Sequence, residues 1–251
     1  MIELESLTKR YAGVTAVRDL TLSVDRGEIF GFIGPNGAGK TTTIKMLGGI
    51  LAPTQGQVRI CGFDMATAPE QAKRRIGFIP DRPYLYEKLT AMEFLRFIAA
   101  LHGIGKNGFY QRAEKELHRF SLWEWSNELI ESFSHGMKQR LVMAAALLTE
   151  PEVIIVDEPM VGLDPIAIKM VKDLFRCLAG SGTTIFMSTH TLQVAQDLCH
   201  RIGVIHRGRM IATGSPEQLM HQAETSERDL EAVFIRLTEE DRMGIGGRRD
   251  G

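Results

Sequence analysis

The chain has 251 residues, of which 44% are hydrophobic and 24% are charged, a composition typical of a globular protein. Its 30 basic and 31 acidic residues nearly cancel, so a dedicated nucleic-acid-binding protein is disfavoured and we expect no nucleic-acid partner. The three cysteines lack the spacing of a disulfide framework or a zinc site. No apolar run reaches the roughly 20 residues that span a bilayer, and the N-terminus lacks a signal-peptide pattern, so we expect a cytoplasmic protein.

The first third of the chain alternates apolar and polar residues, as strands with one buried face do. The strands that this pattern predicts span residues 2–7, 16–24, 28–33, 57–60 and 76–79. After the third of them, a glycine-rich loop precedes a predicted helix over residues 41–51, which we expect to end before Pro53.

The middle of the chain has a different period. Apolar residues three and four positions apart predict helices between Thr90 and Glu131. The last third returns to short segments, with strands predicted over 153–156, 184–188, 202–206 and 210–213, and helices over 166–178 and 192–199. Strands that alternate with helices predict an α/β fold with a largely parallel central sheet.

This pattern divides the chain into three parts. Residues 1–89 and 150–214 are predicted to form an α/β core with an N-terminal antiparallel β part, and residues 90–149 an inserted helical subdomain. Residues 215–251 are predicted to form a C-terminal tail, helical over 216–240 and disordered over 244–251.

The glycine-rich loop matches the P-loop pattern G-x-x-x-x-G-K-[ST] without a gap. Its residues, with the threonine that follows, are Gly34, Pro35, Asn36, Gly37, Ala38, Gly39, Lys40, Thr41 and Thr42. Glycines let backbone N–H groups turn inward around phosphate oxygens, and the helix N-terminus adds positive potential. We therefore expect ATP to bind here, with Lys40 on the β- and γ-phosphates and the Thr41 hydroxyl on Mg²⁺.

Two acidic residues follow the predicted strand over 153–156. Ligands of an open α/β sheet bind at the carboxyl ends of its strands. We expect Asp157 to bind Mg²⁺, directly or through water, and Glu158 to activate the attacking water as a general base.

Three further segments, in order along the chain, resemble motifs of the ATP-binding cassettes of ABC transporters. Ser134-His135-Gly136-Met137 resembles the signature motif, which in that family contacts the ATP of the other subunit. Asp164, in Gly162-Leu163-Asp164-Pro165, resembles the D-loop aspartate, and His190 matches the switch histidine that contacts the γ-phosphate. Ser134 and Asp164 can also simply cap the helices that follow them. The resemblance runs from Ile2 to Gly214 and implies a P-loop NTPase cassette that hydrolyses ATP.

The chain departs from the family pattern at several positions. His135 stands where the signature has glycine, and we hypothesise that it donates a hydrogen bond to phosphate. Asp81 replaces the glutamine of the Q-loop, and either keeps an oxygen for Mg²⁺ or forms only a Pro-Asp turn. Tyr11, by contrast, follows the family pattern, and the resemblance implies that it stacks on adenine. Similar His-Gly-Met-Lys-Gln signatures occur in drug, lipid and polysaccharide exporters.

The resemblance also implies partners. A transmembrane permease subunit would hold the chain against the inner face of the membrane, docking near Pro83 to Tyr86, unless these residues pack only within the helical part. A second copy, or a related cassette, would complete an ATP-sandwich dimer. The expected function is export powered by ATP hydrolysis. An importer subunit, a soluble ABC ATPase in an assembly role and a regulatory module without turnover remain alternatives.

Overall fold

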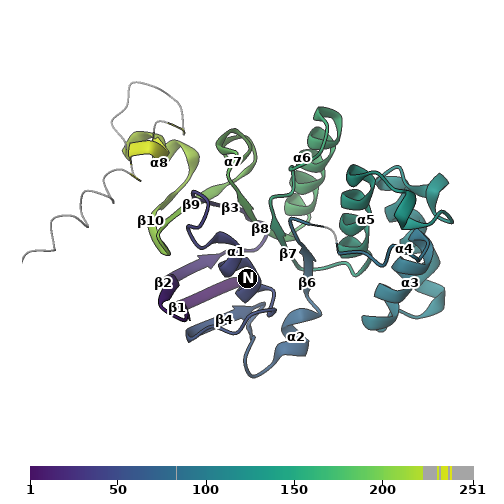
Figure 1. Ribbon diagram of the computed structural model, residues 1–251, viewed down its shortest axis with the longest axis horizontal. Helices are drawn as coiled ribbons and strands as arrows, with labels where there is room; N and C mark the ends of the chain where they lie inside the picture. Colours follow the sequence, from purple (N-terminus) through teal and green to yellow (C-terminus); the bar gives the residue numbers. More distant parts are fainter. Residues whose placement is uncertain (83, 223–230, 232, 237, 239–251) are drawn as a thin grey trace, which may run out of the picture.

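The computed structural model describes residues 1–82, 84–222, 231, 233–236 and 238, and it contains two sheets with helices around them (Figure 1). The smaller sheet is antiparallel, and its strands in spatial order are β2 (Val14–Val24), β1 (Ile2–Tyr11), β4 (Gln55–Ile60) and β5 (Phe63–Asp64). The larger sheet has the order β10 (Arg209–Gly214), β9 (Arg201–His206), β3 (Ile29–Ile33), β8 (Thr184–Thr189), β7 (Val153–Asp157) and β6 (Ile76–Ile79). Its neighbouring strands are parallel except β9 and β10.

Eight α-helices lie wholly within the described part of the chain. Their bounds are α1 (Lys40–Leu47), α2 (Pro69–Lys73), α3 (Ala91–Leu101), α4 (Lys106–Arg119), α5 (His135–Leu148), α6 (Pro165–Gly180), α7 (Leu192–Leu198) and α8 (Pro216–Gln222). Two short 3₁₀ turns, Trp123–Trp125 and Ile130–Ser132, lie between α4 and α5. Figure 1 shows α3, α4 and α5 together at one end of the molecule and α8 at the other.

The inner strands β3, β7 and β8 of the larger sheet are buried on both faces, and β7 shows why its sequence is continuously apolar. Successive side chains of a strand point to opposite faces of the sheet. Val153 and Ile155 join a core cluster with β3, α1 and the smaller sheet, whereas Ile154 and Val156 join a second cluster with α5, α6 and α7. The α/β fold class is therefore confirmed, with the antiparallel N-terminal part in the place that the sequence indicated.

Some boundaries differ from the prediction. Helix α1 ends at Leu47 rather than at residue 51, because Gly48 and Gly49 follow and Gly49 has a positive φ of 64°. Strand β1 runs on to Tyr11 because its ladder with β2 continues after the apolar alternation has ended. In the described part of the tail, Pro216–Gln222 (α8) and residues 231, 233–236 and 238 are helical. The rest of the predicted helical tail and the predicted disorder over 244–251 fall outside the described residues.

No helix in the part of the chain that the structure describes is long and apolar enough to cross a membrane.

Candidate nucleotide-binding site

The loop between β3 and α1 needs glycine at crowded positions. A Cβ atom on Gly34 would lie 2.3 Å from the carbonyl oxygen of Ile205. On Gly39, which has a φ of 112°, it would lie 2.5 Å from the carbonyl oxygen of Ala16. Side chains are therefore excluded from these two points, and the loop backbone is packed tightly against β9 and β2. A backbone held in this way can present its N–H groups as a preformed nest for an anion.

Lys40 lies at the first position of α1, and only 7% of it is exposed. Its ammonium donates hydrogen bonds to the carbonyl oxygens of Gly34 (2.6 Å) and Pro35 (3.3 Å). Burial lowers the pKa of Lys40, while the nearby charges of Glu158 and Asp157 act in the opposite direction. The site thus contains a partly desolvated cation, Lys40, at the N-terminus of α1. A lysine ammonium and a helix N-terminus together suit a polyphosphate.

Asp157 is the last residue of β7 and is 4% exposed. Its carboxylate accepts a hydrogen bond from the hydroxyl of Ser188, the residue directly opposite it on β8. Burial raises the pKa of Asp157, hydrogen bonds from Ser188 and Thr41 lower it, and the charges of Asp81 and Glu158 raise it. A bound cation would offset both the burial of the Asp157 carboxylate and the charges of the nearby carboxylates.

Glu158 and His190 form a pair. The Nδ1 atom of His190 lies 2.8 Å from Oε1 of Glu158, and the backbone N–H of His190 donates to Oε2 (3.3 Å). Glu158 has a φ of 50°, which is left-handed and rare for a residue with a side chain. Such strain persists where the surroundings impose it and is common at functional sites. Both carboxylate oxygens are thereby held in one orientation.

These groups line one cavity of about 360 Å³. Its lining consists of Ala16, Pro35, Asn36, Gly37, Gly39, Lys40, Thr41, Thr42, Asp81, Asp157, Glu158 and His190. The volume and the mixture of N–H groups, one lysine and carboxylates fit a nucleoside triphosphate with its magnesium ion. Within the described ranges no cluster of three or more His, Cys, Asp or Glu could hold a metal alone. The oxygens of Thr41, Asp157 and Asp81 suit Mg²⁺, which usually completes its shell with phosphate and water.

Several predicted site residues lie outside this lining. Gly34 and Ala38 shape the loop backbone, and Ala38 is itself buried. Tyr11, at the end of β1, is 49% exposed, with the ammonium of Lys9 at 5.5 Å from its ring. Its stacking on adenine stays a prediction.

The signature and D-loop residues also lie outside the cavity lining. Ser134 is the N-cap of α5 and accepts from the N–H of Met137 (3.3 Å), with His135 and Gly136 between them in the first turn. Asp164 is the N-cap of α6 and accepts from the N–H of Ala167 (2.8 Å). The capping roles are therefore present, and contacts with a second ATP stay a prediction.

One residue of the cavity wall and one buried residue behind it were not predicted from the sequence. Ser188 orients Asp157, and Ala16 forms part of the wall beside the P-loop. The signal for Ser188 is its place at the end of a strand, but only the pairing of β7 with β8 brings it opposite Asp157.

Residues 17–161 match the family described as ABC transporter, and the chain belongs to that family. Two relatives illustrate its range. The chain is 34% identical over 240 residues to "Probable multidrug ABC transporter ATP-binding protein YbhF" of Escherichia coli, covering 94% of this chain and 41% of that protein. It is 36% identical over 220 residues to "Nod factor export ATP-binding protein I" of Cupriavidus pinatubonensis, covering 88% and 68% respectively. The chain thus spans less than half the length of the first of these.

Solved structures agree with this assignment. An ATP-binding subunit of an ABC transporter superposes with a TM-score of 0.89 at 35% identity, covering 95% of this chain and 99% of that one. A bacterial ABC transporter cassette solved as a dimer gives a TM-score of 0.80 at 27% identity, covering 86% and 98%.

Proposed function

We propose that the chain is the ATP-hydrolysing subunit of an exporter and acts through a separate transmembrane subunit. The observation that carries the proposal is the convergence of Lys40, Asp157 and the Glu158–His190 pair on one cavity beside the P-loop. A lysine for the phosphates, an acid for a cation and an oriented carboxylate for water are the parts that phosphoryl transfer to water needs.

Each side chain has a defined task in hydrolysis. The ammonium of Lys40 exchanges the Gly34 and Pro35 carbonyls for phosphate oxygens and balances the charge that develops there. Glu158, oriented by His190, accepts the proton of the attacking water. Thr41, Asp157 and Asp81 would hold Mg²⁺, which supplies neutralising charge and alignment for the β- and γ-phosphates.

The second part of the proposal is a dimer. The N-terminus of α5, with Ser134 as its cap, lies outside the lining of this chain's own cavity. Free N–H groups at such a terminus suit an anion. The ATP of a second copy or of a related cassette would supply that anion, and the dimeric cassette of similar fold supports this arrangement.

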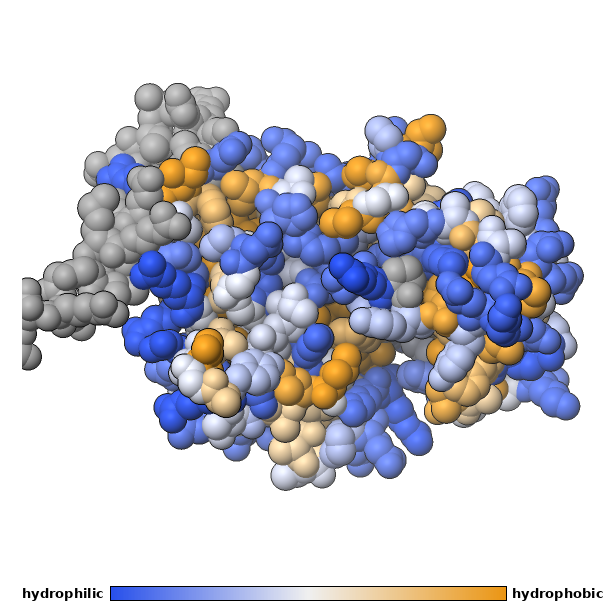
Figure 2. Space-filling view, in the orientation of Figure 1, coloured by the Kyte–Doolittle hydropathy of each residue, from blue (hydrophilic) through white to orange (hydrophobic). Residues whose placement is uncertain are grey.

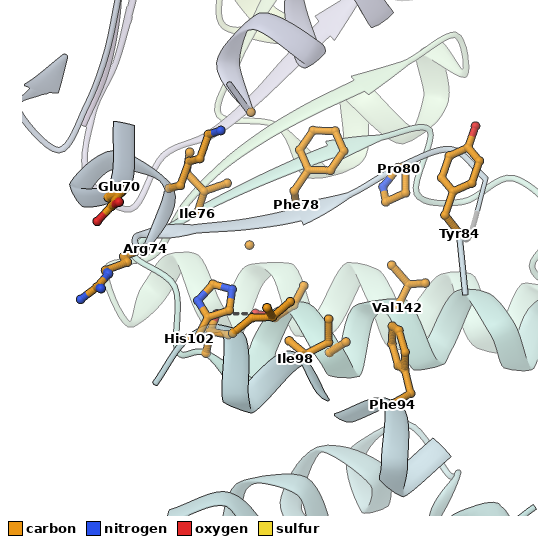
Figure 3. A pocket seen from close by; sticks show the side chains of 17 residues that line it. Glu70, Arg74, Ile76, Phe78, Pro80, Tyr84, Phe94, Ile98, His102 and Val142 are labelled. Atoms are coloured by element: carbon orange, nitrogen blue, oxygen red, sulfur yellow. Dashed lines mark hydrogen bonds between the residues drawn. The ribbon is translucent and has the colours of Figure 1, made fainter. Parts of the chain in front are cut away.

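The third part is docking to the membrane subunit at a groove of about 640 Å³ between β6 and the helical part. Figure 3 shows Phe78 and Pro80 on one wall, with Phe94, Ile98 and Val142 on the other. Tyr84, 82% exposed, stands at one end. Figure 2 shows hydrophobic residues reaching the surface at the end of the molecule formed by α3, α4 and α5. An apolar groove of this size fits a short helix of a partner better than it fits solvent.

The predicted docking segment from Pro83 to Tyr86 fits this groove only in part. Tyr84 lines it, and Leu85 packs on the core. Tyr86 makes an edge contact with Phe97, with ring centroids 5.4 Å apart. Pro83 lies outside the described residues. The segment therefore combines packing within the helical part with an exposed tyrosine for a partner.

The direction of transport and the location are inferred from the relatives. Their names include multidrug transport and Nod factor export. Export through a permease would place this chain at the inner face of the membrane.

The test is Mg²⁺-dependent ATP hydrolysis by the purified full chain, compared with Lys40→Ala and, as a matched control, Lys45→Ala. Lys45 lies on the same helix with its side chain exposed and outside the cavity. We expect Lys40→Ala to reduce turnover at least about a hundredfold, since it removes a charge from the transition state. Lys45→Ala should retain full activity. Equal turnover in the unmodified chain and in Lys40→Ala would overturn the proposal.

A further inference from the structure

His135 contacts the loop between β7 and α6 of its own chain. A Cβ atom placed on Gly162 would lie 2.7 Å from Cδ2 and 2.9 Å from Nε2 of the His135 ring. The ring therefore rests directly on the Gly162 backbone, in space that only a glycine leaves open. Gly162 also has a φ of 77°, so the backbone itself favours glycine there.

That loop is compact and connects to the catalytic carboxylate. It starts at Glu158, whose carbonyl accepts from the N–H of Val161 (3.2 Å). It ends at Asp164, which caps α6. Gly162 therefore lies four residues from Glu158, in the same compact turn. The His135 ring contacts this loop from the first turn of α5.

We propose that His135 is a positioning residue. It links the first turn of α5, which carries the signature motif, to the loop between β7 and α6 of the same chain. The inference rests on the proposed function and deepens it. When the signature turn moves onto the ATP of a second copy, the loop and Glu158 move with it, so closure of the dimer and alignment of the base are coupled. A glycine at 135 would lack the ring and this coupling.

This packing contact is a different role from the hydrogen bond to phosphate that the sequence suggested for His135. Both Cδ2 and Nε2 lie over Gly162, so one edge of the ring packs on backbone. Among the described residues the imidazole has no hydrogen-bond partner, and its packing, not its protons, makes the link. A planar ring without nitrogen atoms should therefore retain the function.

A double-mutant cycle with His135→Gly and Gly162→Ala tests the proposal. Backbone strain at Gly162→Ala is the same in both backgrounds, so the cycle isolates the contact between ring and loop. We expect His135→Gly to lower kcat about fivefold at unchanged KM for ATP, a size usual for coupled neighbours. Gly162→Ala should lower kcat at least about fivefold in the unmodified background, and it should lower kcat clearly less in the His135→Gly background. Equal costs in both backgrounds would overturn the inference.

His135→Phe separates packing from hydrogen bonding. Its turnover should be clearly higher than that of His135→Gly, and the shape of its pH profile should match that of the unmodified chain, because the aromatic ring is kept. If His135→Phe falls to the level of His135→Gly, the ring nitrogens act and the inference is wrong. Turnover of the unmodified chain is measured first. Its absence would overturn the proposed function as well, whereas a zero coupling in an active chain overturns this inference alone.

Discussion

At the scale of single residues, two acidic side chains of the candidate site are fixed in orientation by contacts with neighbouring residues. Glu158 adopts a left-handed backbone and is fixed by two contacts with His190. Asp157 is held by Ser188. The motif residues were predictable because each follows a recognisable pattern in the sequence. Ser188 was not, because its role follows from strand pairing and not from a motif of its own.

The contact between Ser188 and Asp157 gives a prediction at this scale. Ser188→Ala leaves the carboxylate without its hydroxyl donor, so the Mg²⁺ concentration for half-maximal ATPase activity should rise about tenfold, as is usual for such supporting contacts. The control is Ser181→Ala. The exposed hydroxyl of Ser181 donates to the carbonyl of Cys177, away from the site, so this substitution should leave the Mg²⁺ dependence unchanged. An unaltered Mg²⁺ dependence of Ser188→Ala would show that Asp157 does not need this contact.

At the scale of elements, the apolar periodicity of the sequence predicts which segments form strands and helices, but it does not predict where they end. Helix α1 is predicted from its apolar spacing, yet it ends at Leu47 and not at residue 51, because Gly48 and Gly49 end the helix before the apolar periodicity does. The spatial order of the larger sheet, with β3 between β8 and β9, cannot be read from the chain, since it depends on long-range packing. That order brings the P-loop, Asp157 and His190 to one edge.

Helix α3, which forms one wall of the groove, begins with a capping box. The Thr90 hydroxyl accepts from the N–H of Glu93 (3.2 Å), and the Glu93 carboxylate accepts from the N–H of Thr90 (2.8 Å). Thr90→Ala should lower the free energy of unfolding by about 1 kcal/mol, while Thr90→Ser should nearly preserve it. Chemical denaturation measures both. A Thr90→Ala protein as stable as Thr90→Ser would mean that the cap is not needed here.

At the scale of the whole molecule, the nucleotide cavity and the groove both adjoin the segment that follows β6. Asp81 lines the cavity, and Pro80 and Tyr84 line the groove. A partner helix in the groove would therefore contact a segment that reaches the nucleotide within a few residues. This proximity would give ATP binding a short physical route to the proposed membrane subunit.

The groove also carries charge at the end formed by α2. Lys73 and Arg74 line it, and in the described part of the chain neither forms an ion pair, whereas Arg75 pairs with Glu152 (3.1 Å). The double change Lys73→Glu and Arg74→Glu should reduce co-purification with the proposed membrane subunit about tenfold or more, because it reverses two charges that line the proposed docking groove. ATPase activity of the isolated chain should stay unchanged. Lys115→Glu, on the exposed side of α4, is the control, and equal recovery of all three complexes would contradict this placement.

The most direct test of the central claim uses Glu158→Gln, which keeps the shape of the side chain and removes the base. Turnover and ATP-dependent dimerisation are measured together, by phosphate release and by light scattering after gel filtration. We predict that turnover falls at least about a thousandfold, the scale of losing a general base in a preorganised site, while Mg-ATP converts the variant into a stable dimer. A Glu158→Gln protein that hydrolyses ATP at the unmodified rate, or that stays monomeric with ATP bound, would contradict an ATP-sandwich mechanism.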